Sequence, residues 1–285
     1  MVIRKEWNDM LYILTLTWNA VGKLSALYRS LLPSLEGLDW IWIVKDNKSK
    51  DNTIQEIASW KNDRIKVIAH PNNLQNFSEG VNACFHFANP GDDDLVLLLN
   101  NDIIFNDTTS IKKMIDLLNN DPSVGAVGCR LCYTGSQKLQ HCGVVIEETS
   151  RLPMHFRGNQ LSDKAAEMNR EFQSVTGACL LLLAGDFRKS FTNKDSIKGL
   201  DSGLQWCFDD IDLCFSVKYN LGKKILYCGS TNIWHEESAT LKIRPVNKMF
   251  QSQNINYFRN KWKDRYICDK SLYEKDPNYN LYKAK

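Results

Sequence analysis

Three polar residues, Asn100, Asn101 and Asp102, directly follow the apolar run Leu95–Leu99. Such a run is typical of a strand buried on both faces of a parallel sheet, and open α/β sheets bind ligands at the carboxyl ends of their strands. Carboxylate and amide oxygens suit Mg²⁺ or Mn²⁺, which are often shared with substrate phosphates. We predict that Asp102 anchors such a cation against a diphosphate. The alternative is that the three residues only begin a turn.

A second acidic group, Asp209 and Asp210 with a third aspartate two positions on, lies far down the chain. The apolar pattern after it predicts a helix over 209–219 with the acids in its first turn. Capping a helix needs only one or two carboxylates, so we interpret the group as part of a cleft. Asp210 and Asp209 are candidate general bases. Trp206 and Phe208 either wall this cleft, where they would stack on a substrate, or pack in the core.

The composition is that of an ordinary globular protein, with 285 residues, 43% hydrophobic and 24% charged. The first residues are mixed and charged, and no stretch approaches the roughly 18 apolar residues that span a membrane. We therefore expect a cytoplasmic protein. Nine cysteines, mostly in apolar surroundings, predict reduced core thiols rather than disulfides.

Cys129, Cys132, His141 and Cys142 have the residue types of a zinc site. His141 and Cys142 are adjacent, however, and neighbours on an extended segment point to opposite faces. We favour buried thiols in a pair of strands over zinc.

Residues 241–285 hold 11 lysines and arginines but only 4 acidic residues, in a chain whose net charge is +3. Aromatic residues alternate with the basic ones around 257–263, which would suit either nucleic acid or an anionic membrane surface, with peripheral membrane association. The helical spacing of Phe250, Tyr257 and Phe258 instead favours a closing helix with a solvated basic face. We expect no nucleic-acid partner.

The first hundred residues alternate strand-like and helix-like segments, which implies a parallel sheet with right-handed crossovers. Strands are predicted at 12–16, 40–44, 64–69 and 94–99, and helices at 23–32 (ending at Pro33), 51–61, 78–87 and 111–118. Later strands are predicted at 124–132, 142–147, 177–183 and 224–227, with a flexible polar loop at 150–170. We predict an α/β fold with a Rossmann-like, mainly parallel sheet flanked by helices. One domain would span 1–240, with a nucleotide half at about 1–102 and a β-rich acceptor half at about 103–240, and 241–285 would be a helical extension.

The chain from Tyr12 to about Trp262 resembles the GT-A glycosyltransferases of family 2, particularly their rhamnosyltransferase-like branch. Four similar segments lie in the first half of the chain. They are Thr15–Asn19 (the Thr-Tyr-Asn turn), Val44–Thr53 (Val-Asp-Asn-Gly-Ser-Thr-Asp-Gly-Thr), Asn73–Asn82 (Asn-x-Gly-Phe-x-x-Gly-x-Asn) and Asn100–Asp102 (the metal-binding Asp-x-Asp). Three more follow: Leu139–Gly143, similar to a non-catalytic Gln-His-Ala-Gly segment, Asp209–Cys214, similar to Glu-Asp-Val-Asp-Leu-Cys, and Trp234-His235, which matches a histidine after the last core strand.

The resemblance implies metal-dependent, inverting transfer of a hexosyl or deoxyhexosyl group from a nucleoside diphosphate sugar to a hydroxyl of a glycan, lipid-linked or protein acceptor. It assigns donor binding to Thr17, Asn19, Asp46, Asn76, Asn100 and Asn101, the Mg²⁺ or Mn²⁺ site to Asp102 and His235, and base catalysis to Asp210 with Asp209. His235 could instead be a buried core histidine.

The chain departs from the family pattern at several positions. Lys48 and Asn52 stand where glycines are usual, and lysine tolerates a positive φ poorly, so we expect a nucleotide loop of different shape. Asn76 appears in another glycine slot, and Asp209 replaces a glutamate. Two other functions remain open: a catalytically silent sugar-nucleotide or glycan-binding module, and a nucleotidyltransferase, although the chain lacks a basic glycine-rich phosphate loop.

Overall fold

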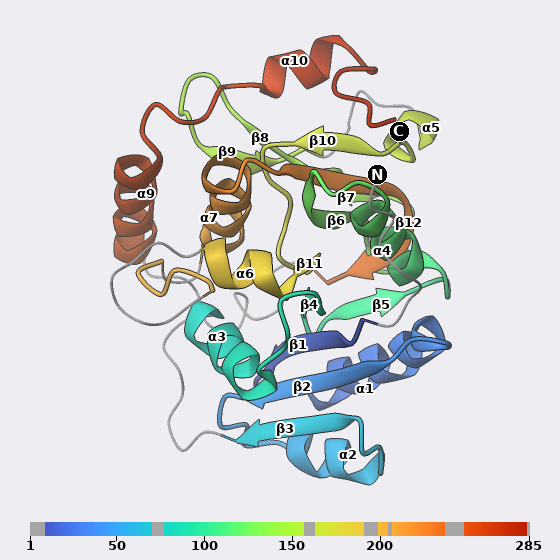
Figure 1. The fold of residues 1–285 in the computed structure, drawn as a ribbon. Coiled ribbons are helices and arrows are strands. Elements are labelled where there is room, and N and C mark those ends of the chain that lie inside the picture. The colour runs from blue at the N-terminus through green and yellow to red at the C-terminus, as the bar shows by residue number, and fades with distance from the viewer. Residues whose placement is uncertain are drawn as a thin grey trace.

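The computed structural model describes residues 9–69, 77–156, 163–190, 199–204, 207–236 and 248–283. Within them, a ten-stranded sheet has the order β10-β12-β6-β11-β4-β1-β2-β3, with β5 paired to β12 and β7 to β6 (Figure 1). A separate hairpin consists of β8 and β9. The strands are β1 (Leu11–Thr17), β2 (Trp40–Asp46), β3 (Ile65–Ala69), β4 (Leu95–Leu99), β5 (Ile103–Phe105), β6 (Val124–Tyr133), β7 (Leu139–His141), β8 (Val144–Ile146), β9 (Pro153–His155), β10 (Arg170–Phe172), β11 (Cys179–Leu183) and β12 (Lys224–His235).

Helices cover both faces of the sheet. They are α1 (Val21–Leu31), α2 (Thr53–Ser59), α3 (Phe77–Ala88), α4 (Ser110–Asn120), α5 (Asp163–Ala166), α6 (Ala184–Ser190), α7 (Asp209–Phe215), α9 (Lys248–Trp262) and α10 (Lys270–Lys275). One apolar cluster joins α1, α2 and α4 to the sheet, and a second joins α3, α6 and α7 to the other face. This is the three-layer α/β arrangement that the alternating pattern predicts.

The central strand β4 shows why its sequence is apolar without alternation. Leu95, Leu97 and Leu99 belong to the first cluster, and Val96 and Leu98 to the second. Both faces of β4 are therefore covered, so every position is apolar. The strands β4, β1, β2 and β3 are parallel to one another, as predicted.

On the side of β4 away from β1, the sheet contains both antiparallel and parallel strand pairs. β11 runs antiparallel to both β4 and β6, so that Cys179 at the start of β11 pairs with Leu99 at the end of β4. The segment that precedes β11 therefore lies at the carboxyl edge of β4. This reversal brings residues around 177 close to Asn100.

Most predicted elements agree with the structure to within two residues, and four differ. The helix predicted to end at Pro33 passes into a 3₁₀ helix, Leu32–Leu35, because a proline in a first turn needs no N–H donor. The α-helix predicted over 209–219 ends at Phe215 and continues as a π-helical turn, Ser216–Asn220. The predicted loop 150–170 contains β9, which pairs with β8, and α5.

The fourth difference is β12, predicted to lie around 224–227, which extends to His235. Its pairing with β6 shifts register between Cys228 and Ile233, and Gly229 and Ser230 lie in this irregular part. The irregularity conceals the continuation of the strand, because it breaks the period-two pattern. His235 therefore ends the last core strand rather than following it.

Helix α9, in the basic segment 241–285, packs beside α7 (Figure 1). Its side chains Asn254, Phe258 and Trp262, four residues apart, are buried, and the two aromatic ones contact Phe215 of α7. This contact agrees with the interpretation of residues 241–285 as carrying a closing helix. The domain boundary at 240 stays a prediction. The Phe250 side chain lies outside the described residues.

Candidate active site

Three neighbouring parallel strands bring the predicted donor-binding residues to one edge of the sheet. Thr17 ends β1, its register partner Asp46 ends β2, and Asn100 follows β4. The side-chain amide of Asn101 donates a hydrogen bond to the Thr17 hydroxyl over 3.2 Å, and the backbone N–H of Asn47 donates to the Thr17 carbonyl over 2.9 Å. The three strand ends are thus joined where open α/β sheets bind ligands.

The loop after β2 folds around the carboxylate of Asp46. Asp46 is buried and accepts hydrogen bonds from the backbone N–H and the hydroxyl of Ser49 over 3.0 and 2.5 Å. From the loop after β1, Asn19 accepts from the Lys50 N–H over 2.7 Å, and its own N–H donates to the Ser49 hydroxyl over 2.8 Å. The loops after β1 and β2 are therefore cross-linked next to Asp46.

Lys48 adopts a φ of +64°, the left-handed conformation that a glycine would take in this loop. A non-glycine residue there costs about 1–2 kcal/mol. Asn52 has a φ of −80° and needs no glycine. Lys48 and Asn52 therefore do not by themselves force the different loop shape that we expected.

Asp102 and His235 lie side by side at the ends of β4 and β12. Nε2 of His235 is 3.2 Å from Oδ1 of Asp102 and 3.5 Å from the side-chain nitrogen of Asn100. Oδ1 of Asp102 is buried and, despite the nearby imidazole, accepts no hydrogen bond. A buried carboxylate oxygen without a donor is costly unless a cation contacts it. The structure therefore brings the two predicted metal ligands together.

Gln140, which the sequence placed in a non-catalytic segment, contacts His235 twice. Its Oε1 lies 2.7 Å from Nδ1 of His235, and its Nε2 donates to the His235 carbonyl over 3.0 Å. Gln140 lies in β7, which pairs with β6, and β6 in turn pairs with β12. No local signal in the sequence could reveal this contact, because it depends on the order of three strands.

His141 lies in a different environment from the three thiols of the zinc hypothesis. Its Nδ1 is 2.9 Å from Nδ1 of His155, and the N–H groups of Gly143 and Thr176 point at its Nε2 over 3.2 and 3.4 Å. Burial, and then the nearby His155 and His235, hold the pKa of His141 well below its usual value. In the part of the chain that the structure describes, no three or more His, Cys, Asp or Glu side chains form a metal-binding group. None of the nine cysteines forms a disulfide, and most of them are buried, as predicted.

Asp210 lies against the segment that precedes β11. Its Oδ2 accepts a hydrogen bond from the Gly177 N–H, and its Oδ1 accepts one from the Ile211 N–H, both over 2.8 Å. A Cβ at position 177 would come within 2.8 Å of the Asp210 Cβ, so this approach requires glycine. The next residue, Ala178, accepts a hydrogen bond from the Asn100 N–H over 2.9 Å. One short segment therefore links Asp210 to the Asn100–Asp102 turn.

The other two acidic residues of α7 have different surroundings. Asp209 is buried, and burial, followed by the charge of Asp210, raises the pKa of Asp209 to about 7. Asp212 accepts hydrogen bonds from Lys261 over 2.8 Å and from the indole N–H of Trp262 over 2.6 Å. The third carboxylate therefore holds α9, which corrects our assignment of all three acids to a cleft.

Phe208 precedes α7 with a φ of +70°, and its ring stacks on Phe258 of α9 with centroids 5.1 Å apart. This contact favours the packing interpretation of Phe208 over acceptor stacking. Trp206 and Asn76, which the sequence also singled out, lie outside the described residues. Among the described helices, none is long and apolar enough to cross a membrane.

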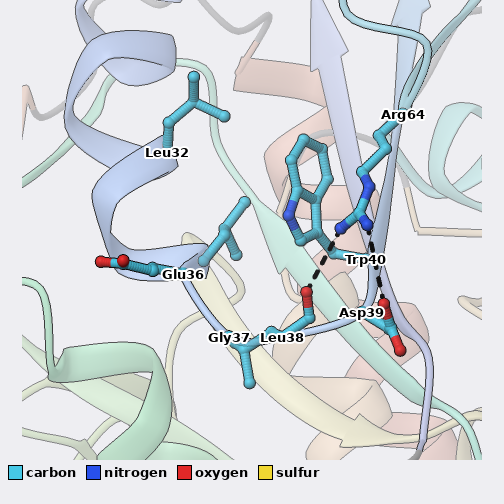
Figure 2. Close-up of a pocket in the computed structure, with 8 residues that line it drawn as sticks. Leu32, Glu36, Gly37, Leu38, Asp39, Trp40 and Arg64 are labelled. Atoms are coloured by element: carbon cyan, nitrogen blue, oxygen red, sulfur yellow. Dashed lines mark hydrogen bonds and ion pairs between the residues drawn. The ribbon is translucent and has the colours of Figure 1, made fainter.

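A hollow of about 450 Å³ lies at the opposite edge of the sheet, where β2 begins. Figure 2 shows its lining, with Arg64 bonded to the Leu38 carbonyl and paired with Asp39 beside Trp40. The carboxyl end of β2, with Asp46, faces away from this hollow. The hollow is therefore separate from the candidate active site.

A sequence model of the family described as "Glycosyl transferase family 2" matches residues 12–168, more than half of the chain. The chain belongs to glycosyl transferase family 2. The match includes the segments around Thr17, Asp46 and Asp102, and it ends before the helix that carries Asp210. No curated protein sequence matches the chain.

Solved glycosyltransferase structures share the fold of this family 2 protein at low sequence identity. GalNAc-T7 with UDP, GalNAc and Mn²⁺ aligns with a TM-score of 0.62 and 12% identity, over 81% of this chain and 44% of its own. The mannosyltransferase PcManGT from Pyrobaculum calidifontis with GDP-Man and Mn²⁺ gives 0.59 and 12%, over 96% and 72%. S. aureus TarS 1–349 with UDP-GlcNAc gives 0.54 and 15%, over 93% and 64%. The shared fold is therefore GT-A, and this chain spans less than half of the GalNAc-T7 chain.

Proposed function

We propose that this chain transfers a sugar from a nucleoside diphosphate donor to an acceptor hydroxyl, with inversion and with the help of a divalent cation. One observation supports this most directly. The Asp102–His235 pair and Asp210 lie at one edge of the sheet, joined through Gly177 and Ala178. A cation-binding group next to a candidate base is what such a transfer needs.

The donor nucleoside would bind at the ends of β1 and β2. Two hydrogen bonds from Ser49 orient the Asp46 carboxylate, and a carboxylate has about four acceptor positions, so others remain for the base or ribose. Thr17 ends β1 and Asn19 lies in the turn that follows. The side-chain amide of Asn101 donates to the Thr17 hydroxyl, and the side-chain nitrogen of Asn100 lies 3.5 Å from Nε2 of His235. We propose that Asn76 completes this set, as the resemblance implies.

Asp102 and His235 fit a Mg²⁺ or Mn²⁺ ion. The buried Oδ1 of Asp102 has no hydrogen-bond donor, and an imidazole nitrogen lies 3.2 Å from it. Substrate phosphates and water would provide the remaining oxygen ligands. When bound, the cation would stabilise the negative charge that develops on the leaving diphosphate. The Mn²⁺ in the GalNAc-T7 and PcManGT structures supports this proposal.

Asp210 would accept the proton of the acceptor hydroxyl while that oxygen attacks the anomeric carbon opposite the leaving group. The Gly177 N–H holds the Asp210 carboxylate in place and leaves it further acceptor positions. Asp209, protonated below a pKa of about 7, would keep a second negative charge away from Asp210. Asp209 would act as the base only if Asp210 does not.

We propose a hexosyl or deoxyhexosyl donor and a glycan, lipid-linked or protein acceptor, in keeping with the rhamnosyltransferase-like resemblance. The TarS and PcManGT structures hold a UDP and a GDP sugar respectively. Relatives in fold thus bind different nucleotides, and the donor must be found by experiment.

The test is nucleotide release by purified protein from a panel of UDP-, GDP- and dTDP-sugars, with and without Mn²⁺. We expect one nucleotide class to be turned over in the presence of Mn²⁺, and Asp210→Asn to remove the turnover while donor binding is kept. Binding of a donor without release, with all acceptors tried, would instead identify a catalytically silent binding module.

A further inference from the structure

We propose that Gln140 is a positioning residue that fixes the tautomer of His235 and thereby sets the affinity of the site for a divalent cation. The proposal rests on the cation site of the proposed function. Gln140 is 4% exposed and touches His235 at both its ring and its backbone. The two contacts together determine the positions of the hydrogens.

The orientation of the Gln140 amide follows from its backbone contact. The carbonyl of His235 can only accept a hydrogen bond, so the atom of Gln140 that lies 3.0 Å from it must be the NH₂ group. Exchanging the amide oxygen and nitrogen would place two acceptors against each other. The amide oxygen therefore faces Nδ1 of His235 at 2.7 Å.

The ring contact then determines the tautomer. The amide oxygen of Gln140 cannot donate, so Nδ1 of His235 carries the hydrogen. In the neutral ring, Nε2 then holds the lone pair, and this is the nitrogen that lies 3.2 Å from Oδ1 of Asp102 and 3.5 Å from the side-chain nitrogen of Asn100. Two electron-rich atoms that face each other attract a cation. Metal-binding histidines commonly donate their other N–H to such an acceptor.

The strands hold both partners in place. β7, which carries Gln140, pairs with β6 through Leu131–His141 and Cys132–Leu139, and His235 pairs with both β6 and β5. Strand pairing on both sides of Gln140 and at His235 therefore holds the backbone of both residues. Gln140 therefore presents a pre-oriented imidazole, which avoids the entropy cost of ordering the ring when a cation binds.

Two measurements on the 285-residue chain test the proposal without using activity. The first is the tautomer of His235 in the metal-free protein, from nitrogen chemical shifts of ¹⁵N-labelled histidine at a pH where the ring is neutral. The second is the dissociation constant for Mn²⁺ alone, from the electron paramagnetic resonance signal of free Mn²⁺. We expect the wild type to show Nδ1–H and to bind Mn²⁺.

Gln140→Leu should shift His235 towards the Nε2–H tautomer and weaken Mn²⁺ binding by about 10- to 100-fold. Gln140→Glu keeps an oxygen acceptor for Nδ1, although it loses the N–H donor to the His235 carbonyl, and should keep the Nδ1–H tautomer. Gln137→Leu, the same change at an exposed position of the same hairpin, is the matched control and should change neither. If the leucine variant does not fold, Gln140→Asn keeps the amide but withdraws it from His235, and should give the same two changes.

Unchanged tautomer and affinity in Gln140→Leu would overturn the proposal, as would a wild type with Nε2–H or without Mn²⁺ affinity. A loss of affinity without a change of tautomer would also overturn it, because it would indicate a merely structural role. These results are distinct from failure of the proposed function. If Asp102→Ala and Asp210→Asn lose turnover while Gln140→Leu behaves as wild type, the glycosyl transfer stands and only the role of Gln140 falls.

Discussion

Replacing Phe258 of α9 by alanine tests whether the basic segment 241–285 is part of the same folded domain as the sheet. The Phe258 ring is fully buried between Phe208, Phe215 and Tyr266, with centroid distances of 5.1, 5.4 and 6.0 Å. Removing a buried phenylalanine leaves a cavity and costs about 3–5 kcal/mol. Domains are stable by only about 5–15 kcal/mol, so this is a large fraction of the total.

Urea unfolding at equilibrium measures the loss, with Asn260→Ala as the control. Asn260 is exposed on the same helix, and its replacement should change the free energy of unfolding by no more than about 0.5 kcal/mol. The Phe258 variant should unfold at a clearly lower urea concentration with a similar dependence on urea. Truncation after Ile243 should give insoluble or destabilised protein for the same reason.

If the free energy of unfolding of the Phe258 variant were less than about 1 kcal/mol below that of the wild type, the packing argument would be refuted, because a cavity at a fully buried ring costs more. A stable, active truncation that no longer sediments with anionic vesicles would point to the same conclusion. Either result would favour the alternative interpretation, in which residues 241–285 form a peripheral membrane anchor.

Three further predictions concern the active site. Asp210→Asn should lower kcat at least about 100-fold, measured by nucleotide release, while donor binding stays near wild type; retained activity would move the base to Asp209. Asp102→Ala should abolish Mn²⁺-dependent binding of the nucleoside diphosphate in calorimetry, since only neutral oxygens remain nearby; unchanged affinity would exclude Asp102 from the site. Asp209→Asn should flatten the pH dependence of stability between about pH 4 and 7. The folded protein holds the Asp209 proton up to a pKa of about 7, whereas the unfolded chain releases it near pH 4, so the contribution of Asp209 to stability falls as pH rises through this window and is absent from the variant. Equal slopes in the two proteins would contradict the burial of a protonated Asp209.

The sequence by itself determined the first half of the fold and the end of β4. The strands from β1 to β4 follow from apolar runs and turn residues that are close in sequence, and parallel order follows from the helices between them. The placement of Thr17, Asp46 and Asn101 at one edge needs nothing more, because parallel strands end on the same side. Asn76 lies outside the described residues, so its role stays a prediction.

Only the tertiary structure decided how the two halves of the site meet. The reversed strand β11 places Gly177 and Ala178 between Asp210 and Asn100, and the irregular β12 carries His235 to Asp102. Such contacts join residues that are far apart in sequence, and their geometry depends on strand order and register rather than on local propensity. Tertiary packing also gives Asp212 a different role from its neighbours Asp209 and Asp210. One more turn of α7 directs that carboxylate to Lys261 and Trp262 of α9, and no pattern of acidic residues distinguishes it from Asp209 before the helices are packed.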